Sequence, residues 1–294
     1  MTELSLKKSI MVTNLDNSTI SFPQDERISF QEEGHIYLLD GTRVLTPVST
    51  VYNRHFVPFD SDYWAPRKAA QEGISAQEMK ERWDCNALRA SCVGTHMHKQ
   101  IEEYLNGDHD MNPYFLFSYN GQHVNVQEPI GIHHEIELFH KFVKEVDFTP
   151  FRTEWRVFDE DLGIAGTIDL ACSCGDGSYE LYDWKRSKSL INECGEVCRD
   201  NRYHTRGING LEHVPDTSYW HYVLQQNLYK RIVEKNYGLT IGAMHLVVLH
   251  PHYSNYHVID VPACPHEVDI ILTEWKKDQL AQNPESVFFK TITD

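Results

Sequence analysis

Three stretches of the chain place apolar side chains three or four residues apart, which is the spacing of one face of an α-helix. The third stretch starts near Ser218 and stops before Gly238, because glycine readily adopts the left-handed backbone that ends a helix. The charged segment after Trp64 and a segment near the C-terminus are also predicted to be helical. We therefore predict helices over residues 65–89, 87–105, 132–146, 218–237 and 267–282.

Strands are predicted between these helices. Apolar and polar residues alternate from Phe151 to Phe158, as in a half-buried strand. Two more short segments follow it, and each connection is a polar turn. An apolar run and a short edge segment come after the long helix. The predicted strands cover residues 151–158, 163–171, 179–184, 243–249 and 256–261.

The first half of the chain carries turn signals instead of long periodic runs. Asp40-Gly41 lies between two apolar runs, which is the strongest short signal for a β-hairpin. The segment from Pro47 to Thr50 then predicts the start of a helix. Residues 107–131 are rich in Gly, Asn, Pro and Asp and are expected to form an exposed loop or insertion, and the first thirty residues a loosely structured lead-in.

The charge balance limits how the chain can hold a polyanion. Its 294 residues include 27 Lys or Arg and 43 Asp or Glu, which gives a formal charge of −16. Binding to nucleic acid by counterion release needs clustered basic side chains. An acidic chain can supply these only in a local groove, so any nucleic-acid partner must be held narrowly.

Composition and cysteine usage are typical of an intracellular protein. No window contains the roughly 18 apolar residues of a membrane span, and residues 1–20 lack the apolar core of a signal peptide. The seven cysteines are an odd number without a zinc-type CxxC pair. We expect structural or incidental cysteines in a reducing compartment.

Candidate chemistry lies on two neighbouring predicted strands. One carries Gly166-Thr-Ile-Asp169 near its end, and after thirteen intervening residues comes Asp183-Trp-Lys185. Side chains two apart on a strand point the same way, so Asp183 and Lys185 share a face. Asp169 lies across a hairpin from them. Carboxylate oxygens are the ligands that Mg²⁺ and Mn²⁺ prefer, and a water activated there can hydrolyse a phosphodiester. The block predicts metal-assisted hydrolysis.

Other motifs strengthen this hypothesis. Thr95 and His98 lie on the helix predicted over residues 87–105, where His98 offers a nitrogen ligand. Glu154, on the strand before Asp169, is a candidate for a further metal ligand or a partner for Lys185. Gln225 and Tyr229 are four residues apart, on one face of the long helix. Taken singly, each of these is typical of a structural or surface residue.

In order and approximate spacing, these motifs resemble the PD-(D/E)XK nuclease superfamily, specifically its RecB-like exonuclease branch. The layout is also similar to the mitochondrial genome-maintenance exonuclease and related phage nucleases, and it spans about residues 35–280. The resemblance implies an α/β (α+β) fold with a restriction-endonuclease-like core, in which helices flank a mixed central sheet, together with an N-terminal hairpin and a helical arch. It predicts a lead-in over residues 1–34 and a single nuclease domain over 35–294, with the arch at about 50–105 and the catalytic core at about 130–280.

The resemblance also implies roles for individual residues. His98, Asp169, Asp183 and the backbone carbonyl of Trp184 would be metal ligands for one or two Mg²⁺ or Mn²⁺ ions. Lys185 would be the catalytic lysine. An iron–sulfur cluster is not expected, because only Cys264 follows the Gln225 motif. The catalytic set is Asp169, Asp183, Lys185, Glu154, Gln225 and Tyr229.

A net-basic stretch from Lys185 to Arg206 is a candidate wall for phosphates, although an ordinary solvated loop has the same composition. Aromatic and basic residues between Phe56 and Arg89 similarly suit either base stacking or plain packing. The predicted DNA-binding residues are Arg89, Thr95, Arg186, Ser187, Lys188, Arg202, Arg206 and Tyr229.

The leading functional hypothesis is a metal-dependent DNA exonuclease that prefers single-stranded ends and acts in repair, recombination or replication. Two alternatives stay open at this point. One is a structure-specific or restriction-like endonuclease on the same core, and the other is a nucleic-acid-binding subunit without catalytic activity. No membrane partner is expected.

Overall fold

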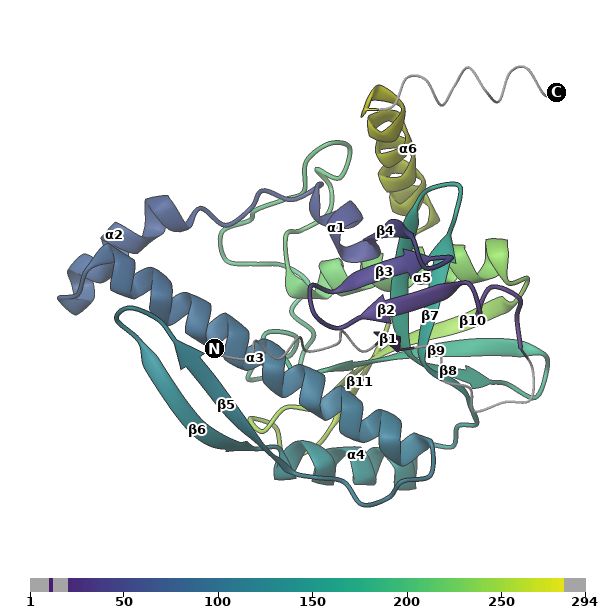
Figure 1. The fold of residues 1–294 in the computed structure, drawn as a ribbon, viewed down its shortest axis with the longest axis horizontal. Helices are drawn as coiled ribbons and strands as arrows, with labels where there is room; N and C mark the ends of the chain where they lie inside the picture. The colour runs from purple at the N-terminus through teal and green to yellow at the C-terminus, as the bar shows by residue number, and fades with distance from the viewer. Residues whose placement is uncertain (1–10, 13–20, 283–294) are drawn as a thin grey trace, which may run out of the picture.

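The computed structural model describes residues 11–12 and 21–282, and it has a mixed central sheet with helices on both faces (Figure 1). This confirms the predicted α+β class and the mixed sheet flanked by helices. Nine described strands form the sheet: β1 (Met11–Val12), β2 (Ile28–Gln31), β3 (Ile36–Leu39), β4 (Arg43–Pro47), β7 (Pro150–Asp159), β8 (Ile164–Ser173), β9 (Ser178–Lys185), β10 (Thr240–Val248) and β11 (His257–Asp260).

The centre of the sheet is the antiparallel meander β7–β8–β9, as the sequence predicts. β10 lies parallel to β9 after the long crossover through α5 (Ser218–Asn236), and β11 pairs antiparallel with β10. β4 attaches the N-terminal strands by a short parallel pairing of Thr46 and Pro47 with the start of β8. One side of β8 therefore pairs with two different strands, β4 at its beginning and β9 at its end.

Two hydrophobic clusters cover the two faces of the sheet. On one face, α1 (Val48–Asn53), α5 and α6 (Pro265–Gln282) pack against residues such as Trp155, Ile168 and Leu181. On the other, α3 (Ala76–Leu105) and α4 (His133–Glu145) pack against Leu170 and Trp184. Burial of these side chains is the main driving force of the fold.

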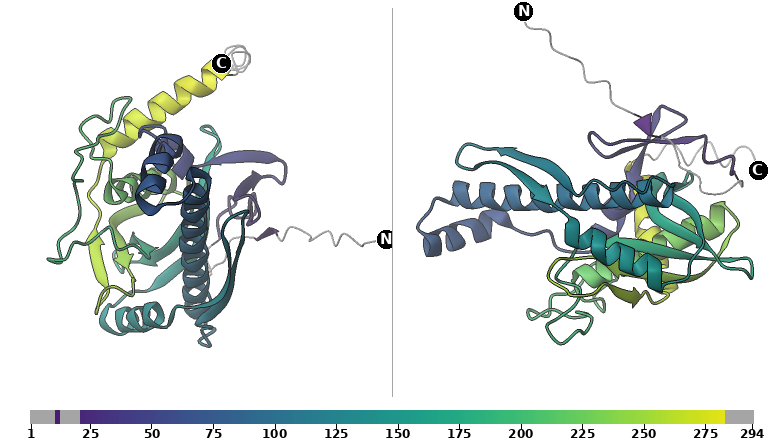
Figure 2. Two further views of the ribbon diagram at one scale, coloured as in Figure 1. Left: turned by 90° about the vertical axis from the view of Figure 1, so that its left-hand side faces the viewer. Right: turned by 90° about the horizontal axis from the view of Figure 1, so that it is seen from below.

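An arm extends from the sheet at the N-terminal half of α3 (Figures 1 and 2). The helix predicted over 65–89 is wrong at residues 73–75, where α2 (Ser61–Glu72) ends in the left-handed Gly73. Its second half joins the predicted 87–105 in α3, a single helix of 30 residues, and α2 runs back along it. The earlier start has a signal in the sequence. Ser75 accepts a hydrogen bond from the Glu78 amide, and serine followed three residues later by glutamate is a capping-box pattern.

Residues 107–131 were predicted to form an exposed loop or insertion, and most of the segment is a largely exposed hairpin, not a loop. Residues 114–131 form a hairpin of β5 (Tyr114–Asn120) and β6 (Asn125–Gly131) along the arm. Glu81 of α3 accepts hydrogen bonds from the backbone amides of His123 and Val124 in the turn. The run of aromatic and apolar residues from Tyr114 to Phe117 is a strand signal, but the Gly, Asn, Pro and Asp residues around it favoured the prediction of a loop.

The structure also differs from the prediction for the lead-in. Residues 1–10 and 13–20 lie outside the described residues, but β2 lies inside the 1–34 segment and belongs to the sheet. The β3–β4 hairpin turns at Asp40-Gly41, where both φ angles are positive, as the DG signal predicts.

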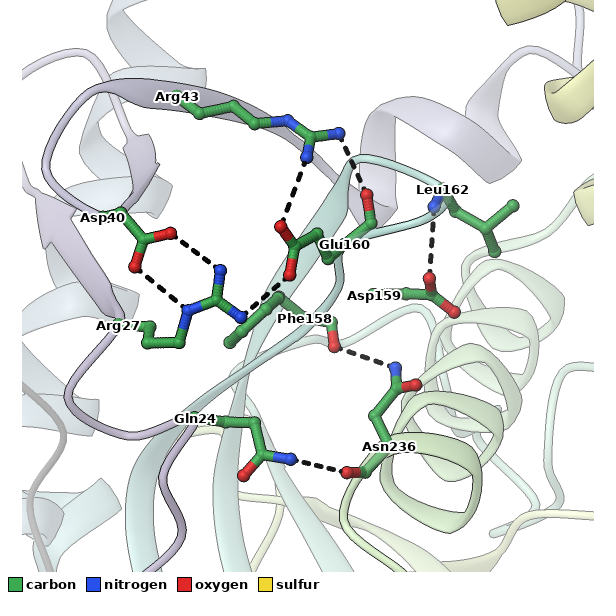
Figure 3. A network of polar contacts seen from close by, with 9 residues as sticks. All are labelled: Gln24, Arg27, Asp40, Arg43, Phe158, Asp159, Glu160, Leu162 and Asn236. Carbon is green, nitrogen blue, oxygen red and sulfur yellow. Dashed lines mark hydrogen bonds and ion pairs between the residues drawn. The ribbon is translucent and has the colours of Figure 1, made fainter. Parts of the chain in front are cut away.

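Polar contacts hold the N-terminal strands to the core (Figure 3). Arg27 binds both carboxylate oxygens of Asp40, at 3.0 and 2.7 Å, and reaches Glu160 after β7 at 2.8 Å. The side chain of Gln24 donates to the Asn236 carbonyl at the end of α5. These contacts connect β2 and β3 to the β7–β8 turn and to α5.

The segment before β2 supplies a partner for a buried charge. Asp25 accepts hydrogen bonds from Arg152, at 3.0 Å, and from the Trp155 indole, at 3.1 Å. Arg152 is fully buried in β7, with its guanidinium over the rings of Phe151 and Trp155. Phe22 and Asp25 of this segment therefore pack against the core. No helix among the described residues is long and apolar enough to cross a membrane.

Asp25→Ala is expected to lower the free energy of unfolding by about 3 kcal/mol, because removing one partner of a buried ion pair strands the other charge. Urea unfolding measures the change. Asp269→Ala on α6 is the matched control, and its exposed pair with Arg231 should give a much smaller loss. Equal losses in the two variants would contradict a buried role for the Asp25 carboxylate.

Candidate active site

A gap opens in the sheet where β8 and β9 separate. The two strands pair from Ser173 and Tyr179 as far as Leu170 and Tyr182, and their ladder stops there. Beyond that point the Asp169 carboxylate accepts the backbone N–H of Trp184 at 2.8 Å. The Asp169 side chain therefore takes the place of a strand carbonyl as the partner of this β9 amide. Because the two strands do not pair beyond this point, a space remains between β8, β9 and β4.

His98 fills one side of this gap. It lies on α3, and its Nε2 donates to the Trp184 carbonyl at 2.8 Å. This contact turns Nδ1 toward the acids, at 3.5 Å from Asp169 and 3.8 Å from Glu154. The nitrogen of His98 and one oxygen from each acid lie within 4.8 Å of one another.

Glu154 reaches this cluster through a strained backbone. It lies opposite Asp169, between the ladder pairs that Thr153 and Trp155 make with β8. Its φ is +45°, in the left-handed region that residues other than glycine rarely adopt. Such conformations cost about 1–3 kcal/mol and occur preferentially at functional sites. Glu154 is the third member of the cluster with His98 and Asp169, so the strained φ lies at a candidate functional residue.

Asp183 and Lys185 share one face of β9, as predicted, and form an ion pair. Lys185 Nζ lies 2.5 Å from Asp183 Oδ2, and 4.3 Å from the centre of the Tyr222 ring. The Asp183 side chain is buried and that of Lys185 is 14 % exposed. A buried pair of this kind excludes water and fixes the ammonium group in position.

The charges of the site stabilise one another. Burial acts to lower the pKa of Lys185, but the Asp183 and Asp169 carboxylates outweigh it and raise that pKa, so the lysine stays protonated at neutral pH. Burial raises the pKa of Asp183 to about 6, although Lys185 opposes the shift. Burial also raises the pKa of Asp169, against the opposing effect of His98.

The same acids act on His98. Burial acts to lower its pKa, but Asp169 and Glu154 raise it to about 9. At neutral pH the imidazole is therefore a cation between two carboxylates. Any other cation that binds these acids must compete with its proton.

The predicted Gln225 and Tyr229 lie together on α5. Gln225 Nε2 donates to the Tyr229 hydroxyl at 3.1 Å. The Tyr229 ring passes so close to β8 that a Cβ at position 166 would lie 2.3 Å from its Cε1. Gly166 is therefore required by the close approach of the ring.

These residues line one cavity of about 800 Å³. Eight predicted site residues meet there: Thr95, His98, Glu154, Asp169, Asp183, Lys185, Gln225 and Tyr229. Its wall also includes Glu102, whose pKa burial and the nearby Glu154 raise to about 7. The sequence analysis missed Arg156 and Tyr37 in this wall. Arg156 follows Glu154 by two residues, and this same-face spacing is a signal that could have identified it.

Other predicted DNA-binding residues do not line this cavity. Arg89 pairs with Glu128 on the β5–β6 hairpin, and Arg186 pairs with the buried Glu135 of α4. Arg206 pairs with Asp200 in the irregular segment after β9. Arg202, Ser187 and Lys188 lie in that same segment, outside the cavity lining.

The donor set suits a divalent cation. His98, Glu154 and Asp169 offer one nitrogen and carboxylate oxygens, which are ligands that Mn²⁺ and Mg²⁺ accept. This group contains His98 and Asp169 of the predicted ligand set together with Glu154, the candidate for a further ligand. Asp183 is engaged by Lys185, the Trp184 carbonyl by His98, and Glu154 takes a place in the cluster.

Comparisons with known proteins give little further information. No family model and no curated protein matches the chain. The crystal structure of the protein named SSO0001 resembles it at 11 % identity and a TM-score of 0.31, covering 79 % of this chain and 74 % of that one. A provisionally named exonuclease from Eubacterium rectale resembles it at 16 % identity and a TM-score of 0.36, covering 65 % of this chain and 64 % of its own. Scores this low carry no conclusion about activity.

Gly166→Ala is expected to destabilise the protein by about 1–3 kcal/mol, because the added methyl group overpacks against Tyr229. Thermal or urea unfolding measures the loss. In a Tyr229→Ala background the same change should cost much less, since the ring is gone. Gly94→Ala on α3 is the control: a Cβ there meets nothing within 4 Å, so it should gain about 1 kcal/mol. If Gly166→Ala is as destabilising in the Tyr229→Ala background as in the unaltered protein, overpacking against the ring is not the cause.

Proposed function

We propose that the protein is a divalent-metal-dependent DNA nuclease of the PD-(D/E)XK superfamily, similar to its RecB-like branch, which hydrolyses phosphodiester bonds at single-stranded ends. The observation that carries the proposal is the pairing of two groups in one cavity. One is the cluster of His98, Glu154 and Asp169, and the other is the buried ion pair of Asp183 with Lys185.

The negative charge of the site supports a need for a cation. Seven carboxylate side chains line the cavity among the described residues, against three Lys or Arg side chains, so a phosphodiester would meet repulsion there. His98, Glu154 and Asp169 would hold Mg²⁺ or Mn²⁺, with Asp183 beside them. When bound, the ion supplies Lewis acidity and lowers the pKa of water at the site.

Lys185 has a separate task. Because its pKa is raised, it cannot act as a general base at neutral pH. Its ammonium instead stabilises negative charge that develops on the phosphate oxygens during the reaction. Asp183 holds the ammonium in place, and Gln225 and Tyr229 line the cavity on the α5 side.

Lys185→Gln is expected to lower the rate of DNA cleavage by about 10²–10³, because the stabilising charge is lost from a buried site. Cation binding should be retained, which calorimetry measures alongside cleavage of labelled DNA. Lys277→Gln on α6 is the matched control, since this lysine is exposed and pairs with Glu274. Unchanged cleavage by Lys185→Gln would remove this residue from the mechanism.

The choice of substrate is tested with labelled linear, circular and duplex DNA in Mg²⁺ or Mn²⁺. An exonuclease leaves a single-stranded circle intact, and cutting of the circle would establish an endonuclease. No cleavage under any of these conditions, with an active control nuclease, would contradict the proposal. Retained DNA binding without cleavage or cation uptake would favour the non-catalytic subunit.

Cation affinity is expected to rise with pH. A raised pKa of about 9 keeps His98 protonated at pH 7, so a bound cation must displace that proton. Between pH 7 and pH 9 the affinity for Mg²⁺ should therefore rise by about tenfold per pH unit, and level off above that. Below pH 6, protonation of Asp183 should weaken binding further.

Calorimetry at a series of pH values measures this dependence and the released proton. His98→Asn is the control, because it keeps a polar side chain but cannot titrate. It should bind the ion more weakly and with a flatter pH profile. Equal affinity of the unaltered protein at pH 7 and pH 9 would contradict the competition.

A further inference from the structure

We propose that the β2–β3 hairpin and Arg156 form a subsite for one unpaired nucleotide next to the reacting phosphate. The rings of Phe30 and His35 would contact the base, and Arg156 would bind its phosphate. The inference rests on the proposed function, and it assigns a substrate-binding role to a part of the chain outside the catalytic motifs.

The hairpin presents aromatic rings to the same cavity as the acids. Phe30, His35 and Tyr37 all line it, and they contact one another with ring centres 4.8 to 5.5 Å apart. Tyr37 is buried at the base of this group, Phe30 is half-buried and His35 is exposed. The two outer rings are therefore available to a flat ligand.

This aromatic wall is fixed relative to the reacting groups. The Tyr37 hydroxyl is hydrogen-bonded to Thr167 of β8, at 2.9 Å, two residues before Asp169. The contacts of Arg27 with Asp40 and Glu160 hold the same strands to the β7–β8 turn (Figure 3). A base bound here would keep a constant distance from the catalytic centre.

Arg156 connects the rings to the acids. It pairs with Thr167 in the β7–β8 ladder, so it lies beside Tyr37, and it follows Glu154 on the same face of β7. It is only 4 % exposed and lines the cavity. Arginine binds phosphate through two N–H groups in a fixed plane, which suits a phosphate between the aromatic wall and Glu154.

A nucleobase matches this wall better than other ligands do. Aromatic side chains stack on bases in a sequence-tolerant manner, and arginine holds the backbone. A base in a duplex is already stacked and paired, so only an unpaired nucleotide can enter. The subsite would therefore give the proposed nuclease its preference for single strands.

The test compares binding of fluorescent oligothymidine with that of the same strand carrying abasic residues. Anisotropy is measured in a Lys185→Gln background with Mg²⁺, so that the strand stays intact. His35→Asn removes a ring while keeping a residue that tolerates the φ of +52° at this position. Phe30→Leu removes a ring but keeps apolar packing. Tyr114→Ala, an exposed ring on β5 outside the cavity, is the control.

Each ring variant is expected to weaken binding of the intact strand by about tenfold, with little effect on the abasic strand. Arg156→Gln should weaken both strands, because its contact is to phosphate. Tyr114→Ala should leave binding of both strands unchanged and, when made in the active protein, should cleave the small diester bis(4-nitrophenyl) phosphate at the unaltered rate.

The outcomes separate this inference from the proposed function. If the unaltered protein cleaves DNA but the ring variants bind and cleave like Tyr114→Ala, the subsite is overturned and the nuclease proposal stands. If the unaltered protein cleaves neither DNA nor the small diester, the nuclease proposal fails. Equal loss on intact and abasic strands in the ring variants would also overturn the subsite.

Discussion

The candidate site depends on one hydrogen bond, from the Trp184 backbone amide to the Asp169 carboxylate. This bond satisfies an amide of β9 at the point where β8 separates from β9, so the sheet can open without leaving a buried amide unpaired. The Trp184 carbonyl is satisfied in the same way by His98. The backbone of one residue, Trp184, thus connects two strands to α3, and its ring packs among Phe139 and Phe142.

Positive and negative groups alternate in space around Trp184. His98 lies between Glu154 and Asp169, and Lys185 pairs with Asp183. Without these cations the buried carboxylates would repel one another and lose ionisation. The site is therefore assembled as a set of mutually dependent charges. This explains how an acidic chain can carry three acids at one opening of its sheet without disrupting it.

Much of this arrangement could be predicted from the sequence, because strand alternation and helix spacing are local signals. They identified β7, β8, β9 and α5, and they placed Asp183 and Lys185 on one face. Contacts between distant segments were not predictable in that way. The pairing of Asp25 with Arg152 forms only when the segment before β2 packs against β7. The hydrogen bond from His98 to the Trp184 carbonyl depends on how α3 crosses the sheet. Arg89 pairs with Glu128 because residues 114–131 form a hairpin beside α3, which the sequence did not predict.

The left-handed backbone of Glu154 has a consequence for how such a protein can change. Glycine would relieve the strain at this position, so a selection for thermal tolerance alone would favour replacing the acid. Heat-adapted variants obtained without a functional screen should therefore accumulate glycine at position 154. If glutamate is retained at position 154 under that selection, its side chain has a function other than stabilising the fold.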